Sequence, residues 1–413
     1  MNNSKKNIKA SWLHISDLHV FPEADTTLML EDFKELSQII SPEFLVVTGD
    51  YRHKQQKTEF SLARDYLETL IGIFHIKKED IFLVPGNHDV NHYDGRTNAI
   101  SEICQRSTAG DYNVYSNYLL SKGFSEYDNF VRKFYAGTNI TDSRITDPSG
   151  VHCVVWNEMI NIILINTALI SDKEKHGQIL DINALSRCWI DSKLPTIMIG
   201  HHGIDSLYPC FSQRMTGVID RRKISAYLHG DSHRYANCPI TRISTPNSTI
   251  PSITCAKSAP QSGDDYSDVG VVYYEWRDDN TYVQAYRWTQ RHFIEDPTYY
   301  YSVNKQYYFP MLCDKADITN SSQILYKQIK NTLNDHNVFM AGKWLNEAEA
   351  AWKISYHEGI GRCLLLFYYE KAAKGEVIAF QRAKELHQEL ERNSNRDTNT
   401  QKMLEATKSL FYS

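Results

Sequence analysis

The sequence lacks features that mark several classes of protein. Its eight cysteines, Cys104 through Cys363, form no CxxC pair and follow no regular spacing, which argues against a zinc ribbon or a disulfide framework and favours thiols in a reducing compartment. No stretch is long and apolar enough to span a bilayer, and the early lysines precede no apolar segment of a signal peptide. We therefore expect a cytoplasmic protein that makes no membrane contact.

An excess of positive charge is missing as well. The formal net charge is −5, so no overall field would draw the chain onto nucleic acid. A local group of cations does occur between positions 214 and 234, namely Arg214, Arg221, Arg222, Lys223 and Arg234. Two interpretations remain open: Arg221 and Arg222 bind a polyanion, or the group is a solvated charged face.

The chain is long enough for more than one domain. At 413 residues it exceeds the usual single-domain size. We expect a large domain over 1–296, a Tyr-rich linker over 297–314, and a helical appendage over 315–413 that is a candidate interaction module. Within the appendage, 359–386 resembles one tetratricopeptide-like helix pair, but a plain helical hairpin is the simpler interpretation because one copy makes no repeat array.

The first hundred residues alternate between strand and helix patterns, which predicts a parallel sheet. Its strands are predicted over 12–15, 44–47 and 81–84, and its helices over 28–40 and 60–74. A polar, Tyr- and Asn-rich stretch over 91–150 is longer than an ordinary connection, and we interpret it as an insertion or lid.

The stretch from 151 to 288 is rich in strand patterns. Strands are predicted over 151–156, 160–165, 196–199, 226–229, 250–255, 269–274 and 282–288, with one helix over 182–194. The first two are expected to pair through a turn at Asn157 and Glu158. The large domain is therefore predicted to be of the α/β class, with a small all-α region after it.

Polar clusters follow five of the predicted strands directly. In chain order they contain Asp17 and His19, then Asp50, then Asn87, His88 and Asp89, then His201, and last Asp231 and His233. Each motif alone is weak, because a turn aspartate or a surface histidine explains it. The ordered set is specific, because the carboxyl ends of such strands meet in a ligand crevice. Carboxylate, imidazole and amide groups gathered there are suited to hold a pair of divalent cations.

This ordered set resembles the calcineurin-like metallophosphoesterase superfamily, over roughly residues 12–288. The resemblance implies a two-sheet β-sandwich flanked by helices and hydrolysis of a phosphate ester by metal-activated hydroxide. It implies two divalent cations as cofactors. By this resemblance Asp17, His19 and His233 hold one cation, Asn87 and His201 hold the second, Asp50 bridges both, and His88 faces the leaving group as proton donor and phosphate stabiliser.

Two positions depart from the family pattern. Asp231 stands where the family has a histidine in G-H-x-H. It either binds the second cation, which would favour manganese or magnesium over zinc at that position, or leaves that cation weakly bound; magnesium, iron and zinc stay open as alternatives to manganese. His53 stands where the second aspartate of G-D-x-x-D orients the catalytic histidine. Either another acid then orients His88, or the pH optimum shifts.

Two residues close in sequence to the predicted ligands, His202 and Arg52, each have two possible roles. His202 rivals His201 as ligand; adjacent residues at a strand end face different ways, and we favour His201 because it fits the family register. Arg52 either contacts substrate phosphate, as proposed also for Arg221 and Arg222, or is solvated.

The predicted function is that of a phosphodiesterase, acting as a nuclease or on a nucleotide, with manganese as the expected metal. The presence of His88 favours an enzyme, and the preference for a diester rests on analogy within the family. The alternative is a catalytically weakened regulatory or scaffold protein that binds a protein partner through its C-terminal helices. The replacements at Asp231 and His53 keep that alternative open.

Overall fold

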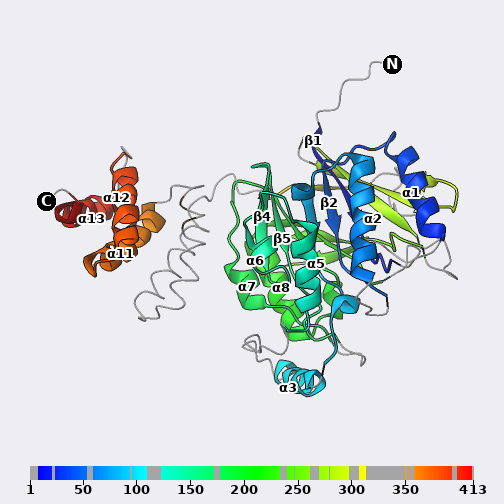
Figure 1. Ribbon diagram of the computed structural model, residues 1–413, viewed down its shortest axis with the longest axis horizontal. Coiled ribbons are helices and arrows are strands. Elements are labelled where there is room, and N and C mark those ends of the chain that lie inside the picture. Colours follow the sequence, from blue (N-terminus) through cyan, green and yellow to red (C-terminus); the bar gives the residue numbers. More distant parts are fainter. Residues whose placement is uncertain are drawn as a thin grey trace, which may run out of the picture. The chain divides into compact units, whose positions relative to one another are not determined.

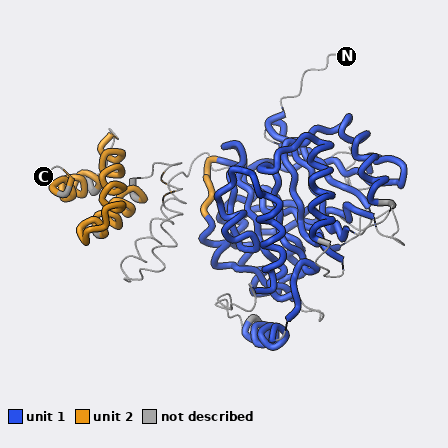
Figure 2. The backbone as a smooth tube through the Cα atoms, viewed as in Figure 1, with its two compact units in different colours: residues 1–188, 194–313 blue, residues 189–193, 314–413 orange. Residues whose placement is uncertain are grey.

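The computed structural model has two compact units, residues 1–188 with 194–313, and residues 189–193 with 314–413 (Figures 1 and 2). It describes residues 8–20, 24–53, 59–93, 95–108, 122–171, 177–232, 240–245, 247–260, 269–278, 280–296, 307–312, 349, 352, 358–392 and 398–411.

The first sheet of the first unit is mixed and has the strand order β12-β11-β10-β1-β2-β3, with β13 paired to β11. Its strands are β1 (Ile8–Ile15), β2 (Phe44–Val47), β3 (Ile81–Leu83), β10 (Gly270–Arg277), β11 (Asn280–Trp288), β12 (Phe293–Glu295) and β13 (Tyr307–Pro310). β1, β2 and β3 run parallel, as predicted, so their carboxyl ends lie at one edge. β10 closes the other side of β1 in an antiparallel pairing.

The second sheet has the order β4-β5-β6-β7-β9-β8. Its strands are β4 (His152–Trp156), β5 (Ile160–Leu164), β6 (Thr196–Ile199), β7 (Ile224–His229), β8 (Ile240–Ser244) and β9 (Thr249–Thr254). β5, β6, β7 and β9 are parallel. β4 and β5 form the predicted hairpin, whose turn residues Asn157 and Glu158 both have positive φ.

Alternation along β1 shows how the two sheets form layers. Trp12 belongs to the apolar cluster between the sheets, stacked between Phe44 and Tyr274 at ring distances of 5.2 and 4.9 Å. Leu13 and Ile15 belong to the second cluster, on the opposite face. Successive strand residues point to opposite faces, so β1 is covered on both sides. Full burial of each large apolar side chain contributes about 1.5–3 kcal/mol relative to exposure.

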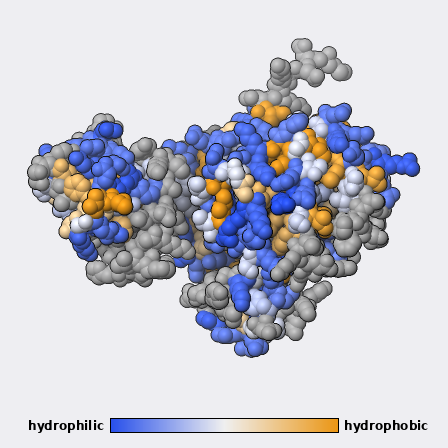
Figure 3. Space-filling model, viewed as in Figure 1, coloured by the Kyte–Doolittle hydropathy of each residue, from blue (hydrophilic) through white to orange (hydrophobic). Residues whose placement is uncertain are grey.

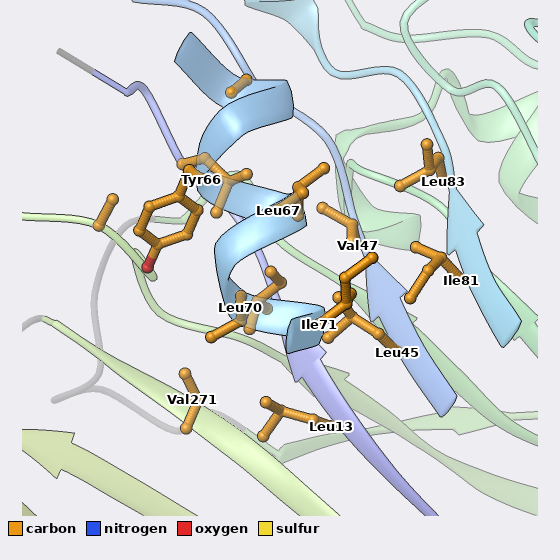
Figure 4. Packing of buried hydrophobic residues seen from close by; sticks show 14 of the residues in the cluster. Leu13, Leu45, Val47, Tyr66, Leu67, Leu70, Ile71, Ile81, Leu83 and Val271 are labelled. Carbon is orange, nitrogen blue, oxygen red and sulfur yellow. The ribbon is translucent and has the colours of Figure 1, made fainter. Parts of the chain in front are cut away.

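Helices cover the outer face of the first sheet. In α2 (Glu59–Phe74) apolar residues recur every three or four positions, and Leu67, Leu70 and Ile71 lie over Leu45 and Val47 of β2 (Figure 4). The other helices among the described residues of this unit are α1 (Ala24–Leu36), α3 (Arg96–Thr108), α5 (Ser125–Phe134), α6 (Ser143–Thr146), α7 (Ile182–Arg187) and α8 (Pro209–Arg221), with short 3₁₀ helices at Lys78–Asp80, Asn87–Asp89 and Ile204–Ser206. The predicted fold class, a two-sheet sandwich flanked by helices, is confirmed.

One predicted helix is too long and some strands were not predicted. The helix expected over 182–194 ends at Arg187, and Cys188, with φ −52° and ψ 125°, has already left the helical conformation; the chain needs the following residues to reach β6 at Thr196. The unpredicted β8 is an edge strand with mostly exposed side chains, so it carries little of the hydrophobic alternation by which strands are recognised.

The second unit contains α11 (Glu358–Ala373), α12 (Val377–Glu391) and α13 (Thr398–Phe411). α11 and α12 form the predicted hairpin, joined through Gly375 with φ +91°. All three helices share an apolar cluster that includes Ile360, Leu386 and Phe411. The helical pattern predicted around 325–333 lies outside the described residues.

On the face shown in Figure 3 the surface is mainly hydrophilic, with small separate hydrophobic areas. Within the described ranges, no helix combines the length and the apolar character needed to cross a membrane.

Candidate metal centre

The loops after β1, β2, β3, β6 and β7 bring most of the predicted site residues together. Potential ligand atoms lie within 4.8 Å of one another in three groups: His19 with Asp50 and His88; Asp17 with Asp50 and His201; and His201 with His202 and Asp231. Asp50 and His201 each belong to two groups, so the groups form one continuous cluster. His233 lies outside the described residues.

The Asp50 carboxylate is at the centre of this cluster. Its Oδ1 accepts the backbone N–H of His88 at 2.8 Å. Its Oδ2 faces the Nε2 atoms of three histidines, at 3.6 Å for His19, 3.3 Å for His201 and 4.0 Å for His88. None of the residues that the structure describes gives this buried oxygen a hydrogen bond of good geometry. Ligands that share one cation at about 2.0–2.2 Å lie roughly 3–4 Å apart, which fits these separations.

Backbone carbonyls fix the orientation of the same three imidazoles. The Nδ1–carbonyl contacts are His19 with Arg52 at 2.9 Å, His201 with Thr48 at 2.6 Å, and His88 with His53 at 2.9 Å. An N–H donated from Nδ1 leaves a lone pair on Nε2, the atom that faces Asp50. This pairing of an outer acceptor with an inward lone pair is typical of metal-binding histidines.

Oxygen atoms of Asn87 and Asp231 lie beside His201 in the cluster. Asn87 Oδ1 lies 2.8 Å from His201 Nε2, and Asp231 Oδ1 lies 3.8 Å from the same nitrogen. The backbone N–H of Asp231 donates to Asp17 Oδ2 at 3.1 Å. The carboxylate that replaces the family histidine therefore lies within the cluster.

Burial makes the charges of this cluster interdependent. Asp17, Asp50 and His201 are completely buried, and His19 is 1% exposed. Burial raises the pKa of Asp50, but His201, His19 and His88 together hold it well below its usual value. Burial lowers the pKa of His201, but the Asp50 carboxylate raises it well above the ordinary value. Buried carboxylates need cations beside them, and the oxygen and nitrogen donors present here fit a pair of divalent metal ions.

Asp89 holds the central loops in place, a role that the sequence did not reveal. Its carboxylate accepts the backbone N–H groups of Asp50 and Gly86 on Oδ2, at 2.9 and 2.8 Å, and that of Tyr51 on Oδ1, at 2.9 Å. Burial and the nearby Asp50 charge raise the pKa of Asp89 to about 7. The G-N-H-D motif contained this residue, but its sequence does not distinguish a carboxylate that binds backbone from one that binds metal.

The backbone of the site is strained. Asp17, His19, Asp50 and Asp231 have φ of 50°, 40°, 58° and 69°. Left-handed backbone costs a non-glycine residue roughly 1–2 kcal/mol, and such strain is concentrated at functional sites. Gly86 is needed for a different reason: a Cβ there would lie 2.1 Å from Asp50 Oδ1, so only glycine allows the two loops to approach this closely.

The structure corrects the expectation that Arg52 contacts substrate. Its side chain is completely buried, and the guanidinium donates to Glu126 Oε2 at 2.9 Å and Asn91 Oδ1 at 3.0 Å. A buried guanidinium requires such partners. It therefore points into the protein and away from solvent.

Arg221 and Arg222 are likewise not brought to the cluster. They lie at the end of α8, just before β7, whereas Asp231 follows the other end of that strand. At about 3.3 Å per residue, a six-residue strand separates the two ends by roughly 20 Å. Arg222 also donates to the carbonyl oxygen of Ser186 at 2.7 Å, so packing within this unit accounts for it.

His53 and His202 lie beside the cluster. The His53 ring is nearly parallel to the His88 ring at 6.1 Å, and its carbonyl, not a carboxylate, orients His88. His202 is 4% exposed and its Nδ1 lies 3.0 Å from the Thr167 hydroxyl. Of the two adjacent histidines, His201 is the one that faces Asp50.

Comparisons with known proteins agree with this geometry. A family model described as calcineurin-like phosphoesterase matches residues 11–235. The uncharacterized metallophosphoesterase-like protein YydB of Bacillus subtilis (strain 168) is 26% identical over 244 residues, which are 55% of this chain and 49% of the relative. The chain thus spans about half the length of that curated relative.

Solved structures give only weak likenesses. GAP50, described as the anchor in the inner membrane complex of Plasmodium, is 11% identical with a TM-score of 0.37, covering 76% of this chain and 93% of its own. Vacuolar protein sorting 29 from Cryptosporidium parvum is 12% identical with a TM-score of 0.32, covering 74% and 100%. Likenesses this weak carry no conclusion about this chain.

Because the family model covers more than half of the 413 residues and its span includes the whole cluster, the chain belongs to the calcineurin-like phosphoesterase family.

Proposed function

We propose that this chain is a phosphodiesterase that binds two divalent cations, with manganese as the preferred metal, and cleaves a nucleotide or a nucleic-acid strand. One observation supports it above all: Asp50 Oδ1 accepts a backbone N–H, while its buried Oδ2 faces the Nε2 atoms of His19 and His201, both of which are oriented as lone-pair donors. That arrangement is suited to a carboxylate that bridges two metal ions.

The residues divide between two metal positions. Asp17 and His19, with His233 from outside the described residues, would hold the first cation. Asn87, His201 and Asp231 would hold the second, and Asp50 would contact both. Asp17, Asp50 and Asp231 give each position two carboxylates, which favours a hard cation such as manganese or magnesium over zinc. Asp231 is 36% exposed, so the second position is open to solvent on its side.

The bound cations would supply a nucleophilic hydroxide and neutralise the phosphoryl oxygens. The chain itself supplies a proton donor at the rim. His88 is 33% exposed on its side chain, its backbone N–H donates to Asp50, and its Nδ1 is held by the His53 carbonyl. When Nε2 also carries a proton, the resulting imidazolium is positioned to protonate the leaving oxygen of an ester bound across the cluster. A neutral carbonyl in place of a carboxylate leaves this imidazole without an anionic partner on Nδ1.

Metal-dependent turnover of a generic bis-aryl phosphodiester tests the proposal. We expect activity of the metal-free full chain to return with manganese and to fall at least about 100-fold in His88→Ala, since positioned acid–base groups typically contribute that much. Arg221→Ala is the control, because this residue lies at the other end of β7, and it should retain wild-type activity.

The outcomes separate the enzyme from its alternative. Absence of turnover with manganese, magnesium, iron and zinc, together with tight binding of a protein partner by 315–413, would support a regulatory scaffold. Among enzymes, a nuclease should lose affinity steeply as salt rises, because strand binding releases counterions. A nucleotide phosphodiesterase should be much less sensitive to salt.

A further inference from the structure

Arg52 connects the metal cluster to the segment over 91–150. Its carbonyl oxygen accepts the Nδ1–H of His19 at 2.9 Å, so the position of this one backbone group sets the direction of His19 Nε2. The backbone N–H of Arg52 also lies 3.4 Å from Asp89 Oδ1. The main chain of Arg52 is therefore part of the frame of the site.

The side chain of the same residue is held by groups distant in sequence. Glu126, at the start of α5, pairs with one guanidinium nitrogen at 2.9 Å, and Asn91 accepts from another at 3.0 Å. The guanidinium carbon lies 4.4 Å from the centre of the Phe60 ring at the start of α2. These contacts leave the fully buried side chain little freedom to turn, and they restrain the peptide that carries the carbonyl.

The burial of the two ion-pair partners is unequal. Arg52 is completely buried, whereas the Glu126 side chain is 30% exposed and lines a cavity of about 280 Å³ between α2 and α5. Loss of the carboxylate would leave a buried cation without its anion. The neighbouring cavity would let water reach the guanidinium, so the protein should still fold while the Arg52 main chain becomes less restrained.

We propose that Arg52 is a positioning residue, whose ion pair with Glu126 and hydrogen bond to Asn91 fix the carbonyl that orients His19. The segment over 91–150 thus sets the affinity of the metal centre through α5. This inference rests on the proposed metal site, because it assigns an outer partner to one of its ligands. It replaces both sequence-based interpretations of Arg52, substrate contact and solvation.

The test is titration of the metal-free full chain with manganese by calorimetry, together with thermal unfolding without metal. In Glu126→Gln we expect manganese affinity to fall about 10-fold, the lower end of the effect of losing an outer partner of a metal ligand, because the Arg52 carbonyl is kept but is less restrained. Asp142→Asn is the matched control. It removes the acid from another ion pair of a buried arginine in the same segment, Asp142 with Arg144 at 2.8 Å, whose arginine donates to the carbonyl oxygen of Glu79 at the far end of β3 from the cluster.

Both substitutions should lower the thermal midpoint, but only Glu126→Gln should weaken metal binding. Asn91→Ala is the second variant and should weaken binding by a smaller factor in the same direction, and it carries the test if Glu126→Gln does not fold. Arg52→Lys keeps the charge but loses the two-pronged contact, and should fall between wild type and Glu126→Gln.

Wild-type affinity in Glu126→Gln and Asn91→Ala, or an equal loss in Asp142→Asn, would overturn the inference while leaving the metal site intact. Failure of the wild-type chain itself to bind manganese would refute the proposed metal site instead.

Discussion

Substitution of Gly86 by alanine should disable the metal site while leaving the fold largely intact. The added Cβ would lie 2.1 Å from Asp50 Oδ1 and 2.4 Å from the Asp50 backbone nitrogen. To lengthen the distance between this Cβ and Asp50 Oδ1 to an ordinary contact of about 3.4 Å, one of the two loops must move by more than about 1 Å. Metal–ligand distances tolerate a change of only about ±0.2 Å. Overpacking of this kind typically costs about 1–3 kcal/mol of stability. The strain should therefore damage the position of Asp50 more than the fold.

The assay is manganese binding to the metal-free variant, with thermal unfolding as the measure of folding. Gly72→Ala provides the matched control, because Gly72 lies inside α2 and a Cβ there would meet nothing within 4 Å. Alanine in a helix interior should stabilise that variant by about 0.5–1 kcal/mol and leave metal binding unchanged. If Gly86→Ala binds manganese as tightly as wild type, the close approach of the two loops is not needed for the site, and the reasoning fails.

Three further predictions follow from the same geometry. Asp231→His should shift metal preference from manganese toward zinc, measured by competition between the two ions, because it replaces a hard oxygen donor with imidazole; an unchanged preference would remove Asp231 from the donor set. Burial lowers the pKa of His152 to about 4, so the unfolded chain takes up a proton below about pH 6.5 that the folded chain refuses until about pH 4. The contribution of His152 to stability should be constant above pH 6.5 and fall by about 3 kcal/mol toward pH 4. The loss of stability between the two pH values, measured by urea unfolding, should therefore be smaller in His152→Gln than in the wild type by about this amount. Manganese at 100 times its dissociation constant should stabilise the wild type by about 2.7 kcal/mol but not Asp50→Asn; equal stabilisation of both would contradict the central role of Asp50.

The sequence predicted the parts of the site that follow from local patterns. Phe44–Val47 was predicted to the residue as a strand, because a short apolar run followed by Thr48, Gly49 and Asp50 has a clear end. The same logic placed Asp17, Asn87 and His201 after their strands, and parallel pairing then placed them at the sheet edges. Such residues are predictable because the strand pattern and the ligand motif are adjacent in the chain.

Contacts between distant segments were not predictable. Arg52 and Glu126 are separated by 74 positions, and no local pattern pairs a particular arginine with a particular glutamate. The partner that orients His88 is the backbone carbonyl of His53. Because every residue has such a carbonyl, the sequence could not indicate that it takes the place of the acid that orients the histidine in the family. Arg221 and Arg222 were misplaced because they are close in sequence to the motif at Asp231, although residues that precede a strand lie at the opposite end from residues that follow it.

The most direct test of the account is the electron paramagnetic resonance spectrum of the metal-free full chain loaded with two equivalents of manganese. Two cations bridged by Asp50 should give a spin-coupled signal, and Asp50→Asn should give only the signal of isolated manganese. A wild-type spectrum of isolated ions at full loading would contradict the claim that one carboxylate joins two metals at the edge of these sheets.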